Sequence, residues 1–391
     1  MRIGIDCRTI LNPGFGEKSG VGHYTYYLVN SLLDLDRRNN YVLFFDELLD
    51  REAAERLVGG RKNVKMVFFP FHKYRHLNLD DYSKYLINAF FEKEKLGVLH
   101  LPSPHLYTGR AAKKMVVTLH DLAVFRYPEW FPKIEKESQV LIKEAVVDAD
   151  KIISVSNFTK EEAIKILKLD PEKIRIVPNG VDTRRHFLLT EDIISPDDCV
   201  DLGDLDRKYK TGENYILYLG AIEPRKNILG VVESFKIFIA ESGLDYNLII
   251  AGLPGIKSEK ILAELKREEK ESGGRIKYIG YVPHADKFPL IKYARCFVFL
   301  SNYEGFGFPP LEAMDMGTPV IASDIPPIVE VAGKGALLFA PDNYKDIALA
   351  MEKLIKDEEM RKALVKEGLK RARLYSWLRV ARETLEVFKK V

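Results

Sequence analysis

Cysteine is scarce in this sequence, and the few cysteines do not cluster. There are three in 391 residues, Cys7, Cys199 and Cys296, and two of them stand inside apolar strand patterns. A disulfide framework or a cysteine-rich metal site needs thiols grouped more closely, so this spacing argues against both. We interpret the three as buried thiols of a reducing compartment.

An excess of one charge and long apolar runs are also lacking. The 60 basic and 57 acidic residues leave a formal net charge of +3, too small to argue for a nucleic-acid partner. No apolar run approaches the length that spans a bilayer, and a strand pattern begins at the N-terminus in place of a signal peptide. We therefore expect a cytoplasmic protein, which could still contact the inner face of the membrane peripherally.

Apolar strand patterns alternate with amphipathic helical patterns along most of the chain. This alternation predicts an α/β protein of two tandem doubly wound, Rossmann-like domains, because 391 residues exceed what one core usually supports. The predicted strands are 2–7, 41–45, 64–69, 98–101, 115–119, 152–155, 174–177, 215–219, 248–251, 276–279, 297–300, 320–322 and 336–339. Helices are expected at 24–35, 46–58, 81–95, 134–148 and 159–168, the last with Thr159 and Glu162 as a capping box.

The alternation lapses after Pro178-Asn179-Gly180, and residues 186–211 are rich in Asp, Ser and Gly. We predict an N-terminal domain over 1–185, a linker over 186–211 and a C-terminal domain over 212–375, with a last helix, 376–391, joining the first domain. Ligands of such sheets bind beyond the carboxyl ends of the strands, so the two domains are expected to face a central cleft.

The stretch 297–317 (FVFLSNYEGFGFPPLEAMDMG) joins a strand to a helix through a glycine loop. Pro309-Pro310 suits the first helical turn and Gly317 suits a helix end. A loop and helix start of this kind favours phosphate. The two glutamates would instead accept hydrogen bonds from hydroxyls, Glu304 from a sugar ring and Glu312, expected in the first helical turn, from a ribose. Alternatively, Glu312 only favours its helix N-terminus and Glu304 is a solvated acid.

Three further groups of residues follow strands or precede helices. Arg225-Lys226 is well placed to neutralise a diphosphate leaving group, although it could be a solvated basic pair. His120-Asp121 ends a strand, where the histidine could bind a sugar hydroxyl, move a proton or have only a structural role. Gly20-Val21-Gly22 could bring backbone N–H groups close to a ligand, but it lacks the third glycine of a dinucleotide fingerprint.

Two Asp-x-Asp pairs could suggest a divalent metal. Asp34 and Asp36 close a helical pattern, and Asp204 and Asp206 lie in the predicted linker, so neither pair follows a strand. We interpret them as solvated acids and predict chemistry without a metal or other cofactor.

Together these residues resemble the retaining glycosyltransferases of family 4, and the resemblance covers nearly the whole chain. Its most specific element is the pair Glu304 and Glu312, with seven residues between them. The supporting motifs are Gly20-Val21-Gly22, His120-Asp121, 154–162 (SVSNFTKEE), 178–182 (PNGVD), 223–227 (EPRKN) and Tyr375-Ser376-Trp377 with the final helix. The resemblance implies the GT-B fold, with the acceptor held mainly by the N-terminal domain and a nucleotide sugar by the C-terminal domain.

The roles of site residues follow from the resemblance as expectations. The implied catalytic residues are His120, Glu304 and Lys226, and His120 would contact the transferred sugar near the reacting carbon. Lys226 and Arg225 would hold the diphosphate, and Glu312 the ribose. Further donor contacts are expected from Gly22, Tyr281, Val282, Gly305, Phe306, Gly307 and Phe308, and acceptor contacts from Gly20, Val21, Tyr24 and Asp121.

One departure from the family pattern concerns the diphosphate. Many relatives carry an arginine directly after the glycine of the phosphate-binding strand, where this sequence has Ala221. Either Arg225 takes over that role, or fewer charges hold the diphosphate.

The implied function is metal-independent transfer of a hexose with retention. Residues 323–333 (SDIPPIVEVAG) and the EPRKN motif are most similar to mannosyltransferase-type members, whose donor is often GDP-mannose. Acceptors in this group are glycans or lipid-linked sugars, as in polysaccharide or lipopolysaccharide biosynthesis. Residues 69–76 (FPFHKYRH) could face such an acceptor or a membrane, or form a solvated loop.

Several alternatives stay open at this point. The chain could be a sugar-nucleotide epimerase of the same architecture, a UDP-sugar-dependent glucosyltransferase, or a non-catalytic nucleotide-sugar-binding protein. The sequence does not decide the linkage or whether the protein is a monomer or a homodimer.

Overall fold

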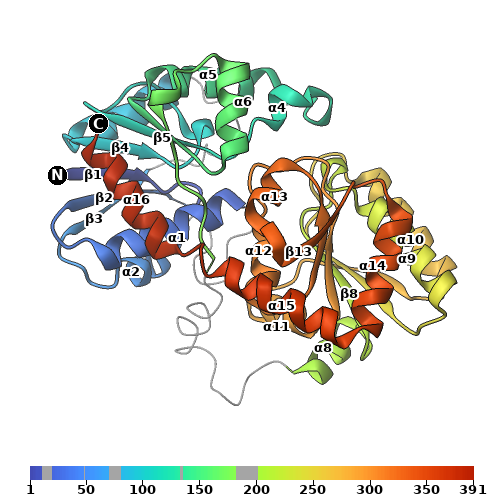
Figure 1. The fold of residues 1–391 in the computed structure, drawn as a ribbon. Helices are drawn as coiled ribbons and strands as arrows, with labels where there is room; N and C mark the ends of the chain where they lie inside the picture. The colour runs from blue at the N-terminus through green and yellow to red at the C-terminus, as the bar shows by residue number, and fades with distance from the viewer. Residues whose placement is uncertain (11–19, 48, 70–80, 133–134, 182–200) are drawn as a thin grey trace. The chain divides into compact units, whose positions relative to one another are not determined.

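The computed structural model describes residues 1–10, 20–47, 49–69, 81–132, 135–181 and 201–391 (Figure 1). It divides into two compact units, one of Met1–Gly180 with Trp377–Val391 and the other of Val181–Ser376. Gly14, Gly16, Cys199, most of 69–76 and part of the predicted linker lie outside the described residues.

The first unit contains a seven-stranded sheet in the order β3-β2-β1-β4-β5-β6-β7. All of its paired strands are parallel. The strands are β1 (Arg2–Asp6), β2 (Asn40–Asp46), β3 (Val64–Phe69), β4 (Val98–Leu101), β5 (Met115–Leu119), β6 (Lys151–Ser154) and β7 (Ile174–Ile176). The helices are α1 (Gly20–Leu35), α2 (Arg51–Val58), α3 (Asp81–Lys93), η1 (Pro104–Leu106), α4 (Ala123–Arg126), η2 (Pro128–Trp130), α5 (Glu135–Asp148), α6 (Asn157–Leu167), η3 (Pro171–Lys173) and α16 (Trp377–Lys389).

The second unit contains a six-stranded parallel sheet in the order β10-β9-β8-β11-β12-β13. Its strands are β8 (Tyr215–Leu219), β9 (Asn247–Ala251), β10 (Ile276–Gly280), β11 (Cys296–Phe299), β12 (Val320–Ser323) and β13 (Ala336–Phe339). The helices are α8 (Leu202–Tyr209), η5 (Pro224–Lys226), α9 (Ile228–Ser242), α10 (Glu259–Glu271), α11 (His284–Tyr293), α12 (Phe308–Asp315), α13 (Pro326–Ala332), η6 (Gly333–Gly335), α14 (Tyr344–Lys356) and α15 (Glu358–Ala372).

The predicted α/β class and all the predicted strands are confirmed, with ends that differ by about one residue. The central strands are short apolar runs because both faces of a parallel sheet are covered by helices. Every residue of β4, β5, β11 and β12 is buried. The buried thiols of Cys7 and Cys296 belong to this apolar interior.

Strand order reverses once in each sheet, between β1 and β4 in the first unit and between β8 and β11 in the second. From β1 the chain first adds β2 and β3 on one side and then returns to add β4 on the other. In doubly wound sheets the helices on either side of such a reversal lie on opposite faces, and ligands bind at the carboxyl ends of the two central strands. The fold therefore singles out the loops after β1, β4, β8 and β11.

The C-terminal helix α16 packs within the first unit. Trp377 is buried and stacks on Tyr27 of α1, with ring centroids 5.4 Å apart and planes 15° apart. The strongly amphipathic sequence of α16 explains this placement, because most of its apolar side chains recur at helical spacing and are buried. The return of the last helix was expected from its apolar stripe.

Three local predictions were wrong. Residues 202–209, within the predicted linker, form α8, whose cap is a capping box of Asp201 and Asp204. The N-cap of α6 is Ser156, which accepts a hydrogen bond from the Thr159 backbone, so Thr159 is not a cap. Glu312 is not in the first turn of α12, because the helix begins at Phe308.

The interpretation of the Asp-x-Asp pairs as solvated acids was wrong for Asp36, which is buried, and all three remaining members bind protein groups. Asp34 forms an ion pair with Arg61. Asp36 accepts hydrogen bonds from Tyr41, Asn39 and the Arg38 backbone, and Asp206 accepts one from the Gly212 backbone. Within the described ranges, no group of three or more His, Cys, Asp or Glu side chains is arranged to hold a metal ion.

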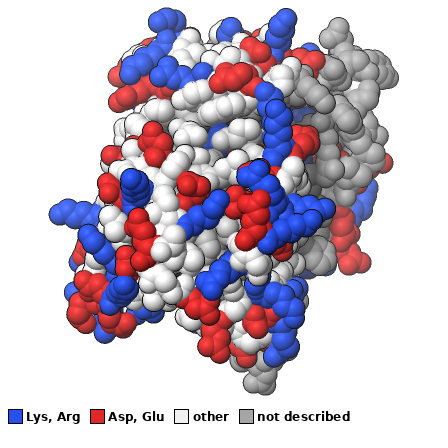
Figure 2. Space-filling view, turned by 90° about the vertical axis from the view of Figure 1, so that its right-hand side faces the viewer, with Lys and Arg blue, Asp and Glu red and all other residues white. Residues whose placement is uncertain are grey.

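The surface carries charges of both signs. Figure 2 shows basic and acidic side chains interspersed over one face, without a large patch of either sign, as the near-zero net charge leads one to expect. None of the helices in the described part of the chain is both long and apolar enough to cross a bilayer.

Gly252 allows the close approach of two chain segments at the carboxyl edge of the second sheet. Its φ is +146°, and a Cβ there would lie 1.8 Å from the Gly220 carbonyl oxygen. We expect Gly252→Ala to destabilise the second unit by about 3 kcal/mol, since it adds backbone strain to overpacking. Urea unfolding measures this change. Gly243→Ala is the control, because its φ is also positive (+65°) but its Cβ would meet nothing within 4 Å. Equal destabilisation by the two variants would contradict the clash.

Candidate active site

The strand reversal of the second unit carries a basic turn. After β8 the chain forms η5, where Pro224 takes the first position and Asn227, in the left-handed region at φ 49°, ends the turn. This tight turn places Arg225 and Lys226 side by side at the carboxyl end of a central strand. The Asn302 backbone N–H donates to the Arg225 carbonyl at 2.8 Å, which fixes the turn against the loop after β11.

Glu304, in the loop after β11, binds both basic side chains. Lys226 Nζ donates to Glu304 Oε1, and Arg225 Nη1 donates to Oε2 at 2.9 Å. Ser301 Oγ also donates to Oε1, at 2.7 Å. Arg225 lies between two acids, since its Nε is 2.6 Å from Glu223 Oε1. The structure thus brings together the predicted residues Arg225, Lys226 and Glu304, although Glu304 lies about 80 positions along the chain from the two basic residues.

The protonation of this cluster follows from its contacts. Burial alone would raise the pKa of Glu304, but the charges of Lys226 and Arg225 and the hydrogen bonds from Lys226 and Ser301 lower it to about 2. The pKa of Lys226 is lowered by burial and by Arg225, against the opposing effect of Glu304 and Glu223. At neutral pH Glu304 is therefore an ionised hydrogen-bond acceptor that cannot serve as a proton donor.

Glu312 has a partner that sequence reasoning missed. Lys287 of α11 donates to Glu312 Oε1 at 2.5 Å, and both side chains are largely buried. This ion pair joins α12 to the helix that follows the predicted nucleobase residues Tyr281 and Val282. Tyr281 is 38% exposed and Val282 is buried, so the tyrosine presents the larger accessible surface after β10.

The glycine loop between Glu304 and α12 has one position that requires glycine. Gly307 is the N-cap of α12 with φ +117°, and a Cβ there would lie 2.6 Å from Ile328 Cδ1. Phe306 is buried and packs edge-on against Tyr375, with centroids 5.8 Å apart. Gly305 and Phe308 complete the loop and begin the helix.

In the first unit, His120 follows β5 and is half-buried. Its Nε2 lies 2.8 Å from the Pro102 carbonyl oxygen, so Nε2 carries the proton and donates. In the neutral ring, Nδ1 is then an acceptor for a hydroxyl. Burial and the charge of His105 lower the pKa of His120 and outweigh the Pro102 carbonyl and Asp121, which raise it. The neutral form therefore predominates at pH 7.

The predicted acceptor residues occupy different environments. Gly20 and Val21 begin α1 and are exposed and half-buried, respectively, whereas Gly22 is buried. Asp121 accepts a hydrogen bond from the Ala123 backbone at 3.0 Å. The Tyr24 side chain is fully buried, contrary to what an acceptor contact requires. Its ring meets that of His120 edge-on at 4.8 Å, and its hydroxyl shares a hydrogen bond with Thr118.

Two polar groups at this edge were missed by sequence reasoning. His100 of β4 is fully buried, with Nε2 2.9 Å from Thr118 Oγ1, so Thr118 connects it to Tyr24. Asp6, the last residue of β1, forms a buried ion pair with Arg8, which also donates to the Leu106 carbonyl at 2.7 Å. The sequence contains a partial indication of these two groups, because Asp6 and His100 are polar residues within apolar strand patterns.

Burial lowers the pKa of three histidines at this edge of the first unit. The pKa of His100 falls to about 3, and those of His105 and His120 are also lowered. The unfolded chain has ordinary histidines with a pKa near 6.5, so below that pH the unfolded state binds more protons. We therefore expect the unfolding free energy of this unit to decrease as the pH is lowered from about 6.5. The decrease should be at most about 1.4 kcal/mol per pH unit for each histidine.

Urea unfolding between about pH 7 and pH 5 tests this expectation, because ordinary carboxyl groups titrate at lower pH. His100→Asn should give a shallower decline than the unmodified protein. An unchanged slope would show that His100 does not contribute.

Comparison with known proteins adds the family. Residues 18–185 match the description "Glycosyltransferase Family 4", and residues 205–371 match "Glycosyl transferases group 1". The chain is 31% identical over 287 residues to O-antigen chain mannosyltransferase B of Escherichia coli, covering 73% of each protein. It is also 31% identical over 246 residues to O-antigen chain mannosyltransferase RfbU of Salmonella typhimurium, covering 62% of this chain and 61% of that protein.

The fold has close structural counterparts. The crystal structure of Anabaena Alr3699/HepE in complex with UDP-glucose superposes with a TM-score of 0.72 at 16% identity and covers 100% of both chains. At this identity the likeness shows the fold, which is GT-B. The two parallel-sheet units agree with the family matches. The Escherichia coli relative, 31% identical over 73% of the chain, agrees with them too. The chain is therefore a glycosyltransferase of family 4.

Proposed function

We propose that this enzyme transfers mannose from GDP-mannose, with retention, to a glycan or a lipid-linked sugar. The observation that carries the proposal is the cluster of Arg225, Lys226 and Glu304 at the strand reversal of the second unit. A pair of cations beside an ionised carboxylate suits a ligand that joins a diphosphate to a polyhydroxyl ring. The names of the two bacterial relatives support mannose as the sugar and a surface glycan as the acceptor.

Each part of the donor has a proposed partner. Lys226 and Arg225 bind the diphosphate, and Arg225 supplies the charge that Ala221 lacks. Glu304 accepts hydrogen bonds from hydroxyls of the sugar, which the backbone of 305–308 helps to position. Glu312, oriented by Lys287, binds the ribose, and Tyr281 with Val282 lines the base pocket. In the first unit, Gly22 is a further proposed donor residue, and Gly20, Val21 and Asp121 are the proposed acceptor residues.

The proposed reaction proceeds on one face of the sugar. The bond from the anomeric carbon to the diphosphate oxygen breaks while the acceptor oxygen forms its bond from the same side. The acceptor proton passes to the departing phosphate oxygen, so no protein base is required. Lys226 and Arg225 stabilise the negative charge that develops there. His120, neutral with Nδ1 as the acceptor, holds a hydroxyl of the transferred sugar.

Thermal shift with GDP-, UDP- and ADP-sugars tests the donor. A ligand at 100 times its dissociation constant stabilises the folded state by about 2.7 kcal/mol. GDP-mannose should give the largest shift, and a larger shift with a UDP-sugar would overturn the choice of donor. Chelation of divalent metals should leave transfer unchanged. Release of an altered nucleotide sugar without any acceptor would instead support an epimerase.

A further inference from the structure

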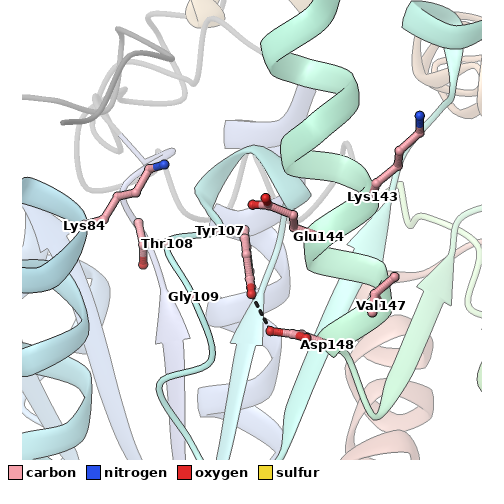
Figure 3. A pocket seen from close by; sticks show the side chains of 8 residues that line it. All are labelled: Lys84, Tyr107, Thr108, Gly109, Lys143, Glu144, Val147 and Asp148. Atoms are coloured by element: carbon pink, nitrogen blue, oxygen red, sulfur yellow. Dashed lines mark hydrogen bonds between the residues drawn. The ribbon is translucent and has the colours of Figure 1, made fainter. Parts of the chain in front are cut away.

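A cavity in the first unit lies apart from every residue assigned to the transfer reaction. The connection from β4 to β5 contains only the short η1, whereas every other connection between strands of this sheet carries an α-helix. The missing helix leaves a space between α3 and α5 (Figure 3). Its volume is about 510 Å³, within the usual range of small-ligand sites.

The floor of this cavity is held by hydrogen bonds. Tyr107 is buried and its hydroxyl donates to Asp148 of α5. Thr108 exchanges two hydrogen bonds of 2.7 Å with Asn88 of α3, one from its hydroxyl and one to its carbonyl. Gly109 continues the floor with φ +122°, and a Cβ there would lie 2.7 Å from Asn88 Nδ2. The floor is therefore a built surface that joins both flanking helices.

The walls carry groups of opposite charge. Glu144 and Asp148 stand one turn apart on α5, and Lys84 stands on α3. Lys143 of α5 also lines the cavity, but its ammonium lies over the Phe125 ring, 5.6 Å from the centroid, and extends away from the space in Figure 3. In Figure 3 the Glu144 carboxylate and the Lys84 ammonium extend toward the space between the helices from opposite sides. An anion would meet the carboxylates of Glu144 and Asp148 here, and a cation would meet the ammonium of Lys84. A neutral polyhydroxyl compound satisfies both walls, because each hydroxyl both donates and accepts.

We infer that this cavity binds a neutral oligosaccharide, namely a part of the acceptor glycan distant from its reacting end. The identity of the occupant rests on the proposed glycan acceptor. The carboxylates of Glu144 and Asp148 accept from sugar hydroxyls, and Lys84 donates to them. A second contact on a long acceptor raises its effective concentration at the reacting site, so longer glycans are better substrates than short ones.

Direct binding is the first test. A mannotetraose is titrated into the full-length protein by calorimetry, and the double variant Lys84→Ala/Glu144→Ala is compared with Lys136→Ala/Glu161→Ala. The control changes an exposed lysine on α5 and an exposed glutamate on α6, away from the cavity lining. We expect the cavity variant to bind about tenfold more weakly, and the control to bind as the unmodified protein does.

Transfer kinetics with acceptors of two lengths are the second test. The cavity variant should raise KM about tenfold for a long mannan acceptor, with kcat unchanged, and should leave KM for a disaccharide acceptor unaltered. Unchanged unfolding midpoints confirm that both variants are folded.

The two tests separate this inference from the proposed function. Active transfer with no difference between variants in either test overturns the cavity site and leaves the function standing. Loss of mannotetraose binding in the cavity variant, with no transfer to any glycan, supports the site and overturns the proposed acceptor. Equal effects on long and short acceptors also overturn the inference.

Discussion

Lys226→Ala is expected to lower kcat by about two to three orders of magnitude, because a preorganised donor at a developing oxyanion is worth about 3–4 kcal/mol. The ammonium of Lys226 is buried and shares Glu304 with Arg225, so neither water nor another lysine replaces it in the described cluster. Steady-state kinetics with saturating donor and acceptor measure the effect.

Lys236→Ala is the matched control for this variant. Lys236 also forms an ion pair with a glutamate, Glu268 at 3.1 Å, but it lies on the surface of α9. We expect its kcat to stay within about twofold of the unmodified enzyme. If Lys226→Ala lowered kcat by less than about threefold, this lysine would not belong to the proposed diphosphate site.

Glu304→Ala is expected to destabilise the second unit by roughly 3 kcal/mol, the lower end of the range for breaking a buried ion pair. Removing the carboxylate leaves the buried Lys226 without its partner, whereas Arg225 retains Glu223 at 2.6 Å. The urea-unfolding transition of this unit measures the loss, and turnover should fall as well.

Glu268→Ala gives the comparison for Glu304→Ala. Glu268 is buried too, but its partners Lys236 and Arg267 are about half exposed and can return to water. Its ion pairs are therefore worth at most about 1 kcal/mol. Similar destabilisation by both variants would show that the cations near Glu304 gain solvent when the carboxylate is removed.

Much of the fold follows from the sequence pattern alone. The apolar runs predicted every strand, and the position of Glu304 after one central strand and Lys226 after another predicted that they would lie at one edge. Parallel strands make this inference sound, because all their carboxyl ends share that edge. Strand order itself was not predicted, since similar apolar runs do not reveal which strands pair.

Contacts between distant side chains could not be predicted. Nothing in the sequence pairs Lys287 with Glu312, 25 positions apart and on separate helices. The family resemblance implied that Tyr24 contacts an acceptor, but its place on the apolar stripe of α1 turns it inward. Composition misled in 202–209, where Asp and Gly suggested a linker while Asp201 and Asp204 cap a helix.

The neutral pairing at Arg225, Lys226, Glu223 and Glu304 has a consequence for how a donor enters. The charges of two cations and two carboxylates already balance. Most of the free-energy cost of dehydrating the cations is therefore incurred when the protein folds. An arriving diphosphate then replaces a carboxylate as the partner of cations that are already in place. Binding of this kind releases few mobile ions, and donor affinity should vary little with ionic strength.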